Sequence, residues 1–358
     1  MYMKIGIALS GGVDSAAAAT DLINKGYEVT AYHMKTISEE TFKIIPEKTK
    51  VCCSPSDTLD AVKIADILGI ELRIIDIKEF FKKNIIDYFI DEYYYGRTPN
   101  PCVVCNNVVK FGRLMNIALN DGMEKFASGH YAKIINDKYF DYVIARGKSL
   151  QKDQSYFLSR IKKYKLESII FPNGIRTKQE IRSLAEKAKL PVHKKRESQE
   201  VCFIPDNDYR RFLNDNGITP KMGNIVDENG RILGTHKGLP FYTIGQRKGL
   251  GITAKEKLYV IDFDYKDNLI IVGPKEKTYK THFTIEKENW FVDKPQNLDL
   301  KCMIRSSMAP VSCQIIIDAN ETEIIFEKPV SAITPGQLAV LYNKNYVIGS
   351  GFISEVIE

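Results

Sequence analysis

One segment near the N-terminus constrains the fold more than any other. Residues 4–9 form a short apolar run, KIGIAL, that ends at Ser-Gly-Gly, and residues 14–24 then follow with helical spacing. A buried strand that ends at glycines and leads directly into a helix is typical of a parallel α/β sheet. The alternation continues, with strands expected at 27–34 and 71–77 and helices at 56–68 and 79–94. The pattern predicts an α/β fold with a doubly wound parallel sheet.

The rest of the chain has a different pattern. A hairpin is expected at 131–146, and helical, basic segments follow to about residue 190. From Gly223 onward, short alternating runs are separated by Gly, Pro, Asn and Asp, which is typical of one or two small β-barrels. The expected strands lie at 258–263, 269–272, 313–317, 323–326 and 338–342.

Composition excludes several classes of protein. A length of 358 residues suits two or three domains, and 44% apolar with 27% charged residues indicates a packed globular chain. No apolar run approaches the roughly 18 residues of a membrane helix, and the first nine residues lack signal-peptide architecture. We therefore expect a cytoplasmic protein without a membrane partner. Seven cysteines, an odd number, argue against a disulfide scaffold.

Positive charge is concentrated in one part of the chain. Residues 146–196 contain fifteen Lys or Arg and four Asp or Glu, a net charge of +11, whereas the whole chain carries +6. Such a stretch is either a solvated face or a surface for a polyphosphate backbone, with Tyr156 and Tyr164 interleaved. Charge alone leaves both interpretations open.

The string SGGVDS at residues 10–15 lies where the first strand ends and the first helix begins. A helix N-terminus offers unpaired N–H groups and partial positive charge, which suit phosphate. Gly11 and Gly12 allow an anion to approach the backbone closely, and the hydroxyls of Ser10 and Ser15 can donate hydrogen bonds to it. Asp14 either caps the helix or helps to place Mg²⁺. The alternative is an ordinary tight turn. The string resembles the PP-loop of the N-type ATP pyrophosphatases, and it differs from a Walker loop because no Lys follows its last Gly.

Three cysteines, Cys102, Cys105 and Cys202, are candidates for a chemical role. Cys102 and Cys105 form a CxxC pair after two prolines, near the start of a helix expected from about residue 107, and a helix N-terminus favours thiolate. Cys202 follows the basic stretch. Buried structural thiols, a zinc or iron–sulfur site, and a nucleophile with a sulfur-carrying partner all fit this pattern. We interpret Cys52, Cys53, Cys302 and Cys313 as structural.

An ordered set of strings extends over essentially the whole chain. They are SGGVDS (10–15), GRTPNP (96–101), SGHY (128–131), KDQSYFL (152–158), Val201-Cys202-Phe203, IGQRKGLGI (244–252) and TPGQ (334–337). Together they resemble the bacterial tRNA-specific 2-thiouridylases, which place sulfur at C2 of the wobble uridine in tRNAs for Lys, Glu and Gln.

The resemblance implies an adenine nucleotide α-hydrolase-like PP-loop domain at 1–205, with a basic tRNA-binding insertion near 160–195. A central domain at 206–278 and a C-terminal β-barrel at 279–358 would follow. It also implies a sulfur donor: a persulfide carrier protein, a cysteine desulfurase or sulfide. Residues implied to bind ATP with Mg²⁺ are Ala8, Leu9, Ser10, Gly11, Gly12, Val13, Asp14, Ser15, Met34 and Gly129.

The same resemblance assigns the sulfur chemistry and the RNA contacts. Cys105 would be the nucleophile, and Cys202 would carry sulfur as a persulfide. Residues implied to face the target base are Asn100, Pro101 and Cys102. Residues implied to contact tRNA are Lys152, Asp153, Gln154, Arg305 and Ser306.

One departure from the family pattern concerns Cys102, because the best-known members carry Asp at this position. The substitution supplies a third thiolate beside Cys105 and Cys202, and three Cys ligands can hold a four-iron, four-sulfur cluster with one iron open. We slightly favour sulfur delivery through such a cluster over a persulfide relay, because the relay assigns no role to Cys102.

The sequence is also compatible with two other classes of function. A PP-loop ligase or amidotransferase acting on a small metabolite accounts for SGGVDS, but leaves the basic stretch and the cysteines without a role. A non-catalytic tRNA-binding protein with a structural zinc needs no ATP loop. Release of pyrophosphate that depends on tRNA separates the three classes.

Overall fold

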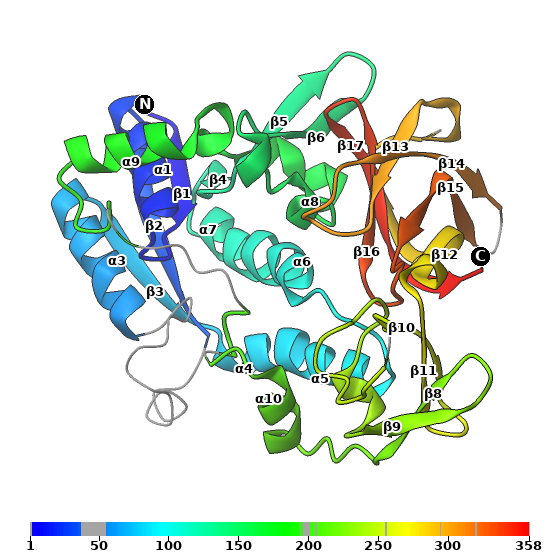
Figure 1. Ribbon diagram of the computed structural model, residues 1–358. Coiled ribbons are helices and arrows are strands. Elements are labelled where there is room, and N and C mark those ends of the chain that lie inside the picture. Colours follow the sequence, from blue (N-terminus) through cyan, green and yellow to red (C-terminus); the bar gives the residue numbers. More distant parts are fainter. Residues whose placement is uncertain are drawn as a thin grey trace.

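The computed structural model describes residues 2–36, 55–193, 195, 201–204, 206–254, 256–293, 295–318 and 321–357. The strands form three sheets, one parallel and N-terminal, one small and central, and one C-terminal (Figure 1). Cys52 and Cys53 lie outside the described residues. Within the part of the chain that is described, every helix is too short or too polar to span a lipid bilayer.

The N-terminal sheet has the strand order β3-β2-β1-β4-β7 and is parallel throughout. Its central strand β1 buries Ile5 and Ile7 completely, as expected for a parallel sheet covered on both faces. The predicted doubly wound sheet is confirmed. The strands are β1 (Lys4–Ala8), β2 (Glu28–Lys35), β3 (Glu71–Asp76), β4 (Lys125–Ala127) and β7 (Ile169–Ile170).

Helices pack around this sheet. The small side chains Ala16, Ala17, Ala18 and Ala19 let α1 approach it closely, and α1 also contacts α9. The helical elements of the first half include α1 (Val13–Asn24), α3 (Pro55–Leu68), α4 (Lys78–Phe81), η1 (Lys82–Ile86), α5 (Asp87–Tyr94), η2 (Cys105–Leu114) and α7 (Met115–Asn120). Those that follow are η3 (Leu150–Lys152), α8 (Ser155–Leu158), η4 (Lys163–Ser168), η5 (Pro172–Ile175), α9 (Lys178–Lys187), α10 (Tyr209–Asp215), η6 (Leu239–Phe241), η7 (Lys275–Thr278) and η8 (Pro295–Asn297).

The helix that carries the CxxC pair starts earlier than the sequence suggested. The short helix α6 (Pro101–Val104) begins at Pro101, so Cys102 lies in its first turn and Cys105 begins η2. Asn100 is the N-cap, because its side chain accepts a hydrogen bond from the Val103 N–H, and Pro101 occupies the first helical position. Both choices are favourable at a helix start. The expected start near residue 107 was therefore wrong by about two turns.

The central and C-terminal strands form two further sheets. The central sheet has the order β10-β11-β8-β9, and in the C-terminal sheet six strands close into a barrel because β12 pairs with β17. The predicted barrel is confirmed. Central strands are β8 (Gly223–Asp227), β9 (Ile232–His236), β10 (Tyr259–Asp264) and β11 (Leu269–Gly273). Barrel strands are β12 (Tyr279–Trp290), β13 (Leu300–Met303), β14 (Val311–Ile317), β15 (Thr322–Ser331), β16 (Leu338–Asn343) and β17 (Tyr346–Val356).

The hairpin β5 (Ala132–Asp137) and β6 (Asp141–Arg146) leaves the N-terminal region and joins the barrel sheet. The pairing is short and runs through Ala145 opposite Tyr346 on β17. In Figure 1 the hairpin lies beside β17. The N-terminal region therefore shares a sheet with the barrel as well as packing against it.

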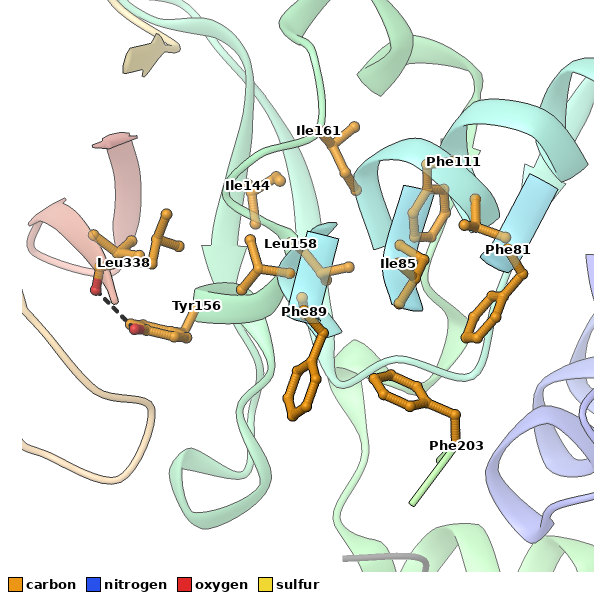
Figure 2. Packing of buried hydrophobic residues seen from close by; sticks show 14 of the residues in the cluster. Phe81, Ile85, Phe89, Phe111, Ile144, Tyr156, Leu158, Ile161, Phe203 and Leu338 are labelled. Carbon is orange, nitrogen blue, oxygen red and sulfur yellow. Dashed lines mark hydrogen bonds between the residues drawn. The ribbon is translucent and has the colours of Figure 1, made fainter. Parts of the chain in front are cut away.

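A buried polar seam joins the segment after α8 to the barrel. The Asn289 side chain donates to the carbonyls of Ser159 and Ile161 at 2.9 and 3.0 Å, and the Ser350 hydroxyl donates to Ser159 at 3.0 Å. In Figure 2 the hydroxyl of Tyr156 donates to the carbonyl of Leu338 at 2.7 Å. Satisfied hydrogen bonds in a buried interface hold the two regions in one relative position.

Candidate functional site

The SGGVDS loop has a strained backbone that only glycine accommodates. Gly11 adopts a φ of 72°, and a Cβ there would lie 2.3 Å from the carbonyl oxygen of Asp57 on α3. Gly12 is the N-cap of α1 with an extended backbone, and among the described residues no side chain caps it. Such a helix start suits an anion, because its first N–H groups have no intrahelical acceptor.

The two serines of the loop lie against each other across the turn. The hydroxyl oxygens of Ser10 and Ser15 are 3.2 Å apart, and the Ser10 N–H donates to Ser15 Oγ at 3.2 Å. Ser15 in turn donates to the carbonyl of Gly12 at 3.1 Å. These bonds keep the turn compact and hold both hydroxyls at its edge.

A cavity of about 280 Å³ opens at the carboxyl ends of β1 and β2. Its position is the usual ligand site of an open α/β sheet. The residues implied to bind ATP that line it are Ala8, Leu9, Ser10, Gly12, Val13, Asp14, Ser15, Met34 and Gly129. Lining residues that the sequence did not indicate for this site are Tyr32, Asp57, Lys110, Ser128, His130, Tyr131 and Lys195.

Asp14 is held by two groups from other elements. Lys178 at the start of α9 approaches both carboxylate oxygens, at 2.7 and 2.8 Å, and the Tyr131 hydroxyl donates to Oδ1 at 2.5 Å. Gly129 packs so tightly on α1 that a Cβ would lie 2.6 Å from the Ser15 nitrogen. The Asn173 side chain then donates to the carbonyls of both Asp14 and Gly129 at 2.9 Å. The SGHY and SGGVDS segments are distant in sequence, but together they form one wall of the cavity.

A third element reaches the loop through Lys195. Its ammonium donates to the Gly11 carbonyl at 3.1 Å and to Asp57 and Asp60 at 2.6 Å each. Burial lowers the pKa of Lys195, but the two carboxylates outweigh that effect and the pKa is raised, so the side chain is charged.

His130 is a buried titratable group in the wall of the cavity. Its side chain is buried between Phe111 and Phe171, and its Nδ1 lies 2.6 Å from the Ser128 hydroxyl. Burial, helped by the positive charge of Lys110, holds the pKa of His130 well below its usual range. The imidazole is therefore neutral at physiological pH and contributes no charge to the cavity.

The KDQ string at residues 152–154 reaches the same cavity. Lys152 and Gln154 line it, and the Gln154 side chain accepts a hydrogen bond from the Tyr131 N–H at 2.9 Å. Asp153 is different, because its side chain is 4% exposed and binds Arg146, the Gly147 N–H and Ser155. A contact of Asp153 with RNA stays a prediction, and in the structure the carboxylate holds its own loop together.

The three cysteines differ in exposure. Cys102 is exposed, whereas Cys105 and Cys202 are half-buried at the edge of the main core. Phe203, next to Cys202, packs edge-on against Phe81 and Phe89, which flank η1 (Figure 2). Both α6 and η2 contact η1. The segments that bear Cys105 and Cys202 therefore pack on the same helix. Cys302 and Cys313 are buried in the barrel, where burial raises the pKa of Cys302 well above its usual range.

No three His, Cys, Asp or Glu side chains among the described residues, which include Cys102, Cys105 and Cys202, are grouped to hold a metal ion. The arrangement thus gives no support to the predicted iron–sulfur cluster. We derive no reaction step through one.

A second cavity, of about 350 Å³, lies between the GRTPNP loop, the central region and the barrel. Its wall joins Thr98 of the GRTPNP loop, Thr243 to Gln246 of the central region, and Arg305 and Gln337 of the barrel. Gln337 donates to the carbonyls of Thr98 and Pro99 at 3.1 and 3.3 Å, and Tyr265 donates to Gly96 at 3.0 Å. The loop that leads to Asn100 and Pro101 is thus held by both β regions. Ser306, adjacent to Arg305, is exposed.

Comparison with known proteins agrees with this architecture. Three family models match in order: a tRNA methyl transferase HUP domain at residues 3–206, a tRNA methyl transferase PRC-barrel domain at 210–274, and an aminomethyltransferase β-barrel domain at 280–353. Fold and loop define a PP-loop α/β enzyme with two appended β-domains.

Relatives identify the family within that class. The tRNA-specific 2-thiouridylase MnmA of Fervidobacterium nodosum is 48% identical, and the alignment covers 99% of this chain and 100% of that protein. The proteins of the same name from Thermotoga petrophila and Thermotoga maritima are each 46% identical, with the same coverage. The chain belongs to the tRNA-specific 2-thiouridylase MnmA family.

Proposed function

We propose that this protein catalyses ATP-dependent 2-thiolation of the wobble uridine of tRNA, with tRNAs for Lys, Glu and Gln as substrates. The observation that carries the proposal is the phosphate-binding loop at the cavity of the parallel sheet, in a chain related over its full length to 2-thiouridylases. A small-metabolite ligase would use the same loop, but would need neither the basic stretch nor the cysteines.

The first step of the proposed reaction takes place at the SGGVDS loop. Uracil O2 is a poor leaving group, so we infer that it attacks the α-phosphorus of ATP, which forms an adenylated uridine and releases pyrophosphate. The uncapped N-terminus of α1, with the Ser10 and Ser15 hydroxyls, stabilises the charge that develops on pyrophosphate. Mg²⁺ would bind the ATP phosphates beside Asp14, whose carboxylate lines the cavity.

The second step needs sulfur close to the adenylated base. Helix η2 begins at Cys105 and carries Lys110, which lines the nucleotide cavity. Five residues of helix advance at most about 7.5 Å along the axis, so Cys105 begins within reach of a base bound at the cavity edge. The wobble base must leave its stack to arrive there.

We assign the sulfur transfer to a persulfide relay. Cys202 accepts a sulfur atom from the donor as a persulfide, whose terminal sulfur adds to C2 while AMP leaves. Cys105 then attacks the remaining sulfur–sulfur bond, so that thiouridine is released and a Cys105–Cys202 disulfide forms, which a thiol reductant must open. The donor in this relay is a persulfide carrier protein or a cysteine desulfurase, because sulfide lacks the oxidised sulfur that a persulfide on Cys202 needs. Cys102, at the N-terminus of α6, faces the target base with Asn100 and Pro101.

We further divide the chain into the PP-loop domain 1–205 with its basic insertion near 160–195, the central domain 206–278 and the barrel 279–358. Lys152, Gln154, Arg305 and Ser306 would bind tRNA, together with the basic stretch. Arg305 is half-buried at the junction of the three domains, where burial lowers its pKa.

Mass analysis of nucleosides from tRNA incubated with the protein, ATP and a sulfur source tests the proposal. We expect 2-thiouridine at the wobble position and pyrophosphate release that requires tRNA. Pyrophosphate release without tRNA would favour a small-metabolite ligase. Binding of tRNA without any pyrophosphate release would favour a non-catalytic binding protein.

Iron–sulfur chemistry is tested separately, with protein reconstituted anaerobically with iron and sulfide. The relay predicts that metal-free protein with a persulfide donor is active and that Cys102→Ala retains this activity. Visible iron–sulfur absorbance and sulfide-dependent activity, both lost in Cys102→Ala, would replace the relay by the cluster route.

A further inference from the structure

Lys195 occupies an unusual position for a residue of a basic segment. It comes from the stretch between α9 and Cys202, yet its ammonium contacts the backbone of the phosphate loop and two carboxylates of α3. Its side chain is 26% exposed, and it lines the nucleotide cavity. These contacts distinguish it from lysines that only present charge to solvent.

The first consequence concerns charge. Asp57 lines the cavity and Asp60 lies one turn further along α3, so two carboxylates stand beside the place expected for the triphosphate. Uncompensated carboxylates would repel ATP. Apart from Lys195, the lysines that line the cavity are Lys110 and Lys152, from other elements, while Lys178 is engaged with Asp14. The ammonium of Lys195, 2.6 Å from both Asp57 and Asp60, cancels part of this repulsion.

The second consequence concerns the backbone. Gly11 has a φ of 72°, and glycine imposes little barrier between backbone conformations, so sequence alone does not fix the peptide that follows it. In a trans peptide the C=O and the next N–H point in opposite directions. The bond from Lys195 to the Gly11 carbonyl therefore also fixes the direction of the Gly12 N–H, one of the donors at the start of α1.

We propose that Lys195 is a positioning residue for ATP, which orients the Gly11–Gly12 peptide and neutralises Asp57 and Asp60 beside the phosphate site. The inference rests on the proposed use of ATP and adds to it a residue outside the SGGVDS string. Lys195 acts through the loop and through α3, so its removal weakens ATP binding more than it slows the chemistry.

The test is Lys195→Met, which keeps the length of the side chain and removes its charge. We expect the KM for ATP in tRNA-dependent pyrophosphate release to rise about 10- to 100-fold, the range for losing hydrogen bonds to charged groups, with kcat at saturating ATP close to wild type. Calorimetric binding of a non-hydrolysable ATP analogue without tRNA should weaken by the same factor. Lys63→Met, the same change at an exposed residue of α3, should leave both unchanged.

A second variant isolates the charge effect. Adding Asp57→Asn and Asp60→Asn to Lys195→Met removes the repulsion, so most of the lost ATP affinity should return. An unchanged KM in Lys195→Met would overturn the inference, and a triple variant as weak as the single one would overturn the neutralising role. Wild-type protein without tRNA-dependent pyrophosphate release would instead refute the proposed function, whatever the variants do.

Discussion

The nucleotide cavity and the cysteine region are built in different ways. The cavity has a contiguous six-residue loop at its centre, and neighbouring glycines, serines and the start of α1 define its shape. The cysteine region takes its residues from α6, η2 and the segment before α10, and its approach loop is held by Gln337 of the barrel and Tyr265 of the central domain. In the proposed mechanism, activation of the base therefore centres on one contiguous loop, whereas sulfur delivery draws on residues from several separate segments.

The largest expected effect separates the two regions. Cys105→Ser or Cys202→Ser should lower 2-thiouridine formation by about three orders of magnitude or more, because each removes a sulfur nucleophile that nothing else replaces. Pyrophosphate release with tRNA should persist, since the loop is intact. Quantification of thiouridine and pyrophosphate in the same reaction checks this. Equal loss of both products would show that the two regions do not act separately.

The loop itself is tested by a matched pair of glycine substitutions. In Gly11→Ala the new methyl would lie 2.3 Å from the Asp57 carbonyl, and the left-handed backbone adds about 1–2 kcal/mol of strain. We expect kcat/KM for ATP to fall at least about tenfold, with a lower melting temperature. In Gly12→Ala the nearest atom is the Ser10 hydroxyl at 3.4 Å and φ is −99°, so the fold should tolerate it. Similar melting temperatures for the two variants would contradict this account.

Loss of the buried polar seam between the segment after α8 and the barrel should lower the stability of the protein more than its catalytic activity. Asn289→Ala leaves the carbonyls of Ser159 and Ile161 without this donor in a buried interface, at a cost of about 1–3 kcal/mol. Thermal unfolding should shift downward, while pyrophosphate release well below the melting temperature stays near wild type. A large loss of activity in a variant that remains folded would place the seam within the chemistry.

The smallest expected effect concerns the basic stretch. Lys165 is engaged with the Phe111 carbonyl at 2.7 Å, so the charges to remove are Lys162 and Lys163. If both meet tRNA phosphate, Lys162→Ala/Lys163→Ala should lower the slope of log K against log salt by about 1–2. Filter binding of tRNA at several salt concentrations measures it, with Lys63→Ala as control. An unchanged slope would leave the pair as a solvated surface.

Sequence predicted the local parts of the molecule well. The strand–glycine–helix unit, the alternation through residue 94 and the β-rich last third depend on periodicity and turn residues, which act over short distances. The start of α6 is also predictable in principle, because Asn100 followed by Pro101 is a favourable N-cap and first helical residue. The helix start expected near residue 107 misses this signal.

Contacts between distant segments were not predictable in the same way. Nothing in the sequence near Lys195 indicates that its side chain contacts Gly11. The cavity residue Tyr131 is more than a hundred residues from the SGGVDS loop in sequence, and Lys110 is nearly as far from it. The pairing of β6 with β17 is likewise decided by which edges meet in the folded chain. Such contacts depend on the three-dimensional packing of whole elements.

That pairing has a consequence for how the chain is made. The ribosome releases Ala145 long before Tyr346, so the outer edge of the β5–β6 hairpin emerges without the strand that covers it in the finished protein. An uncovered strand edge can pair with another chain. The β5–β6 edge is therefore one place where a nascent or truncated chain is open to association, until β17 is made.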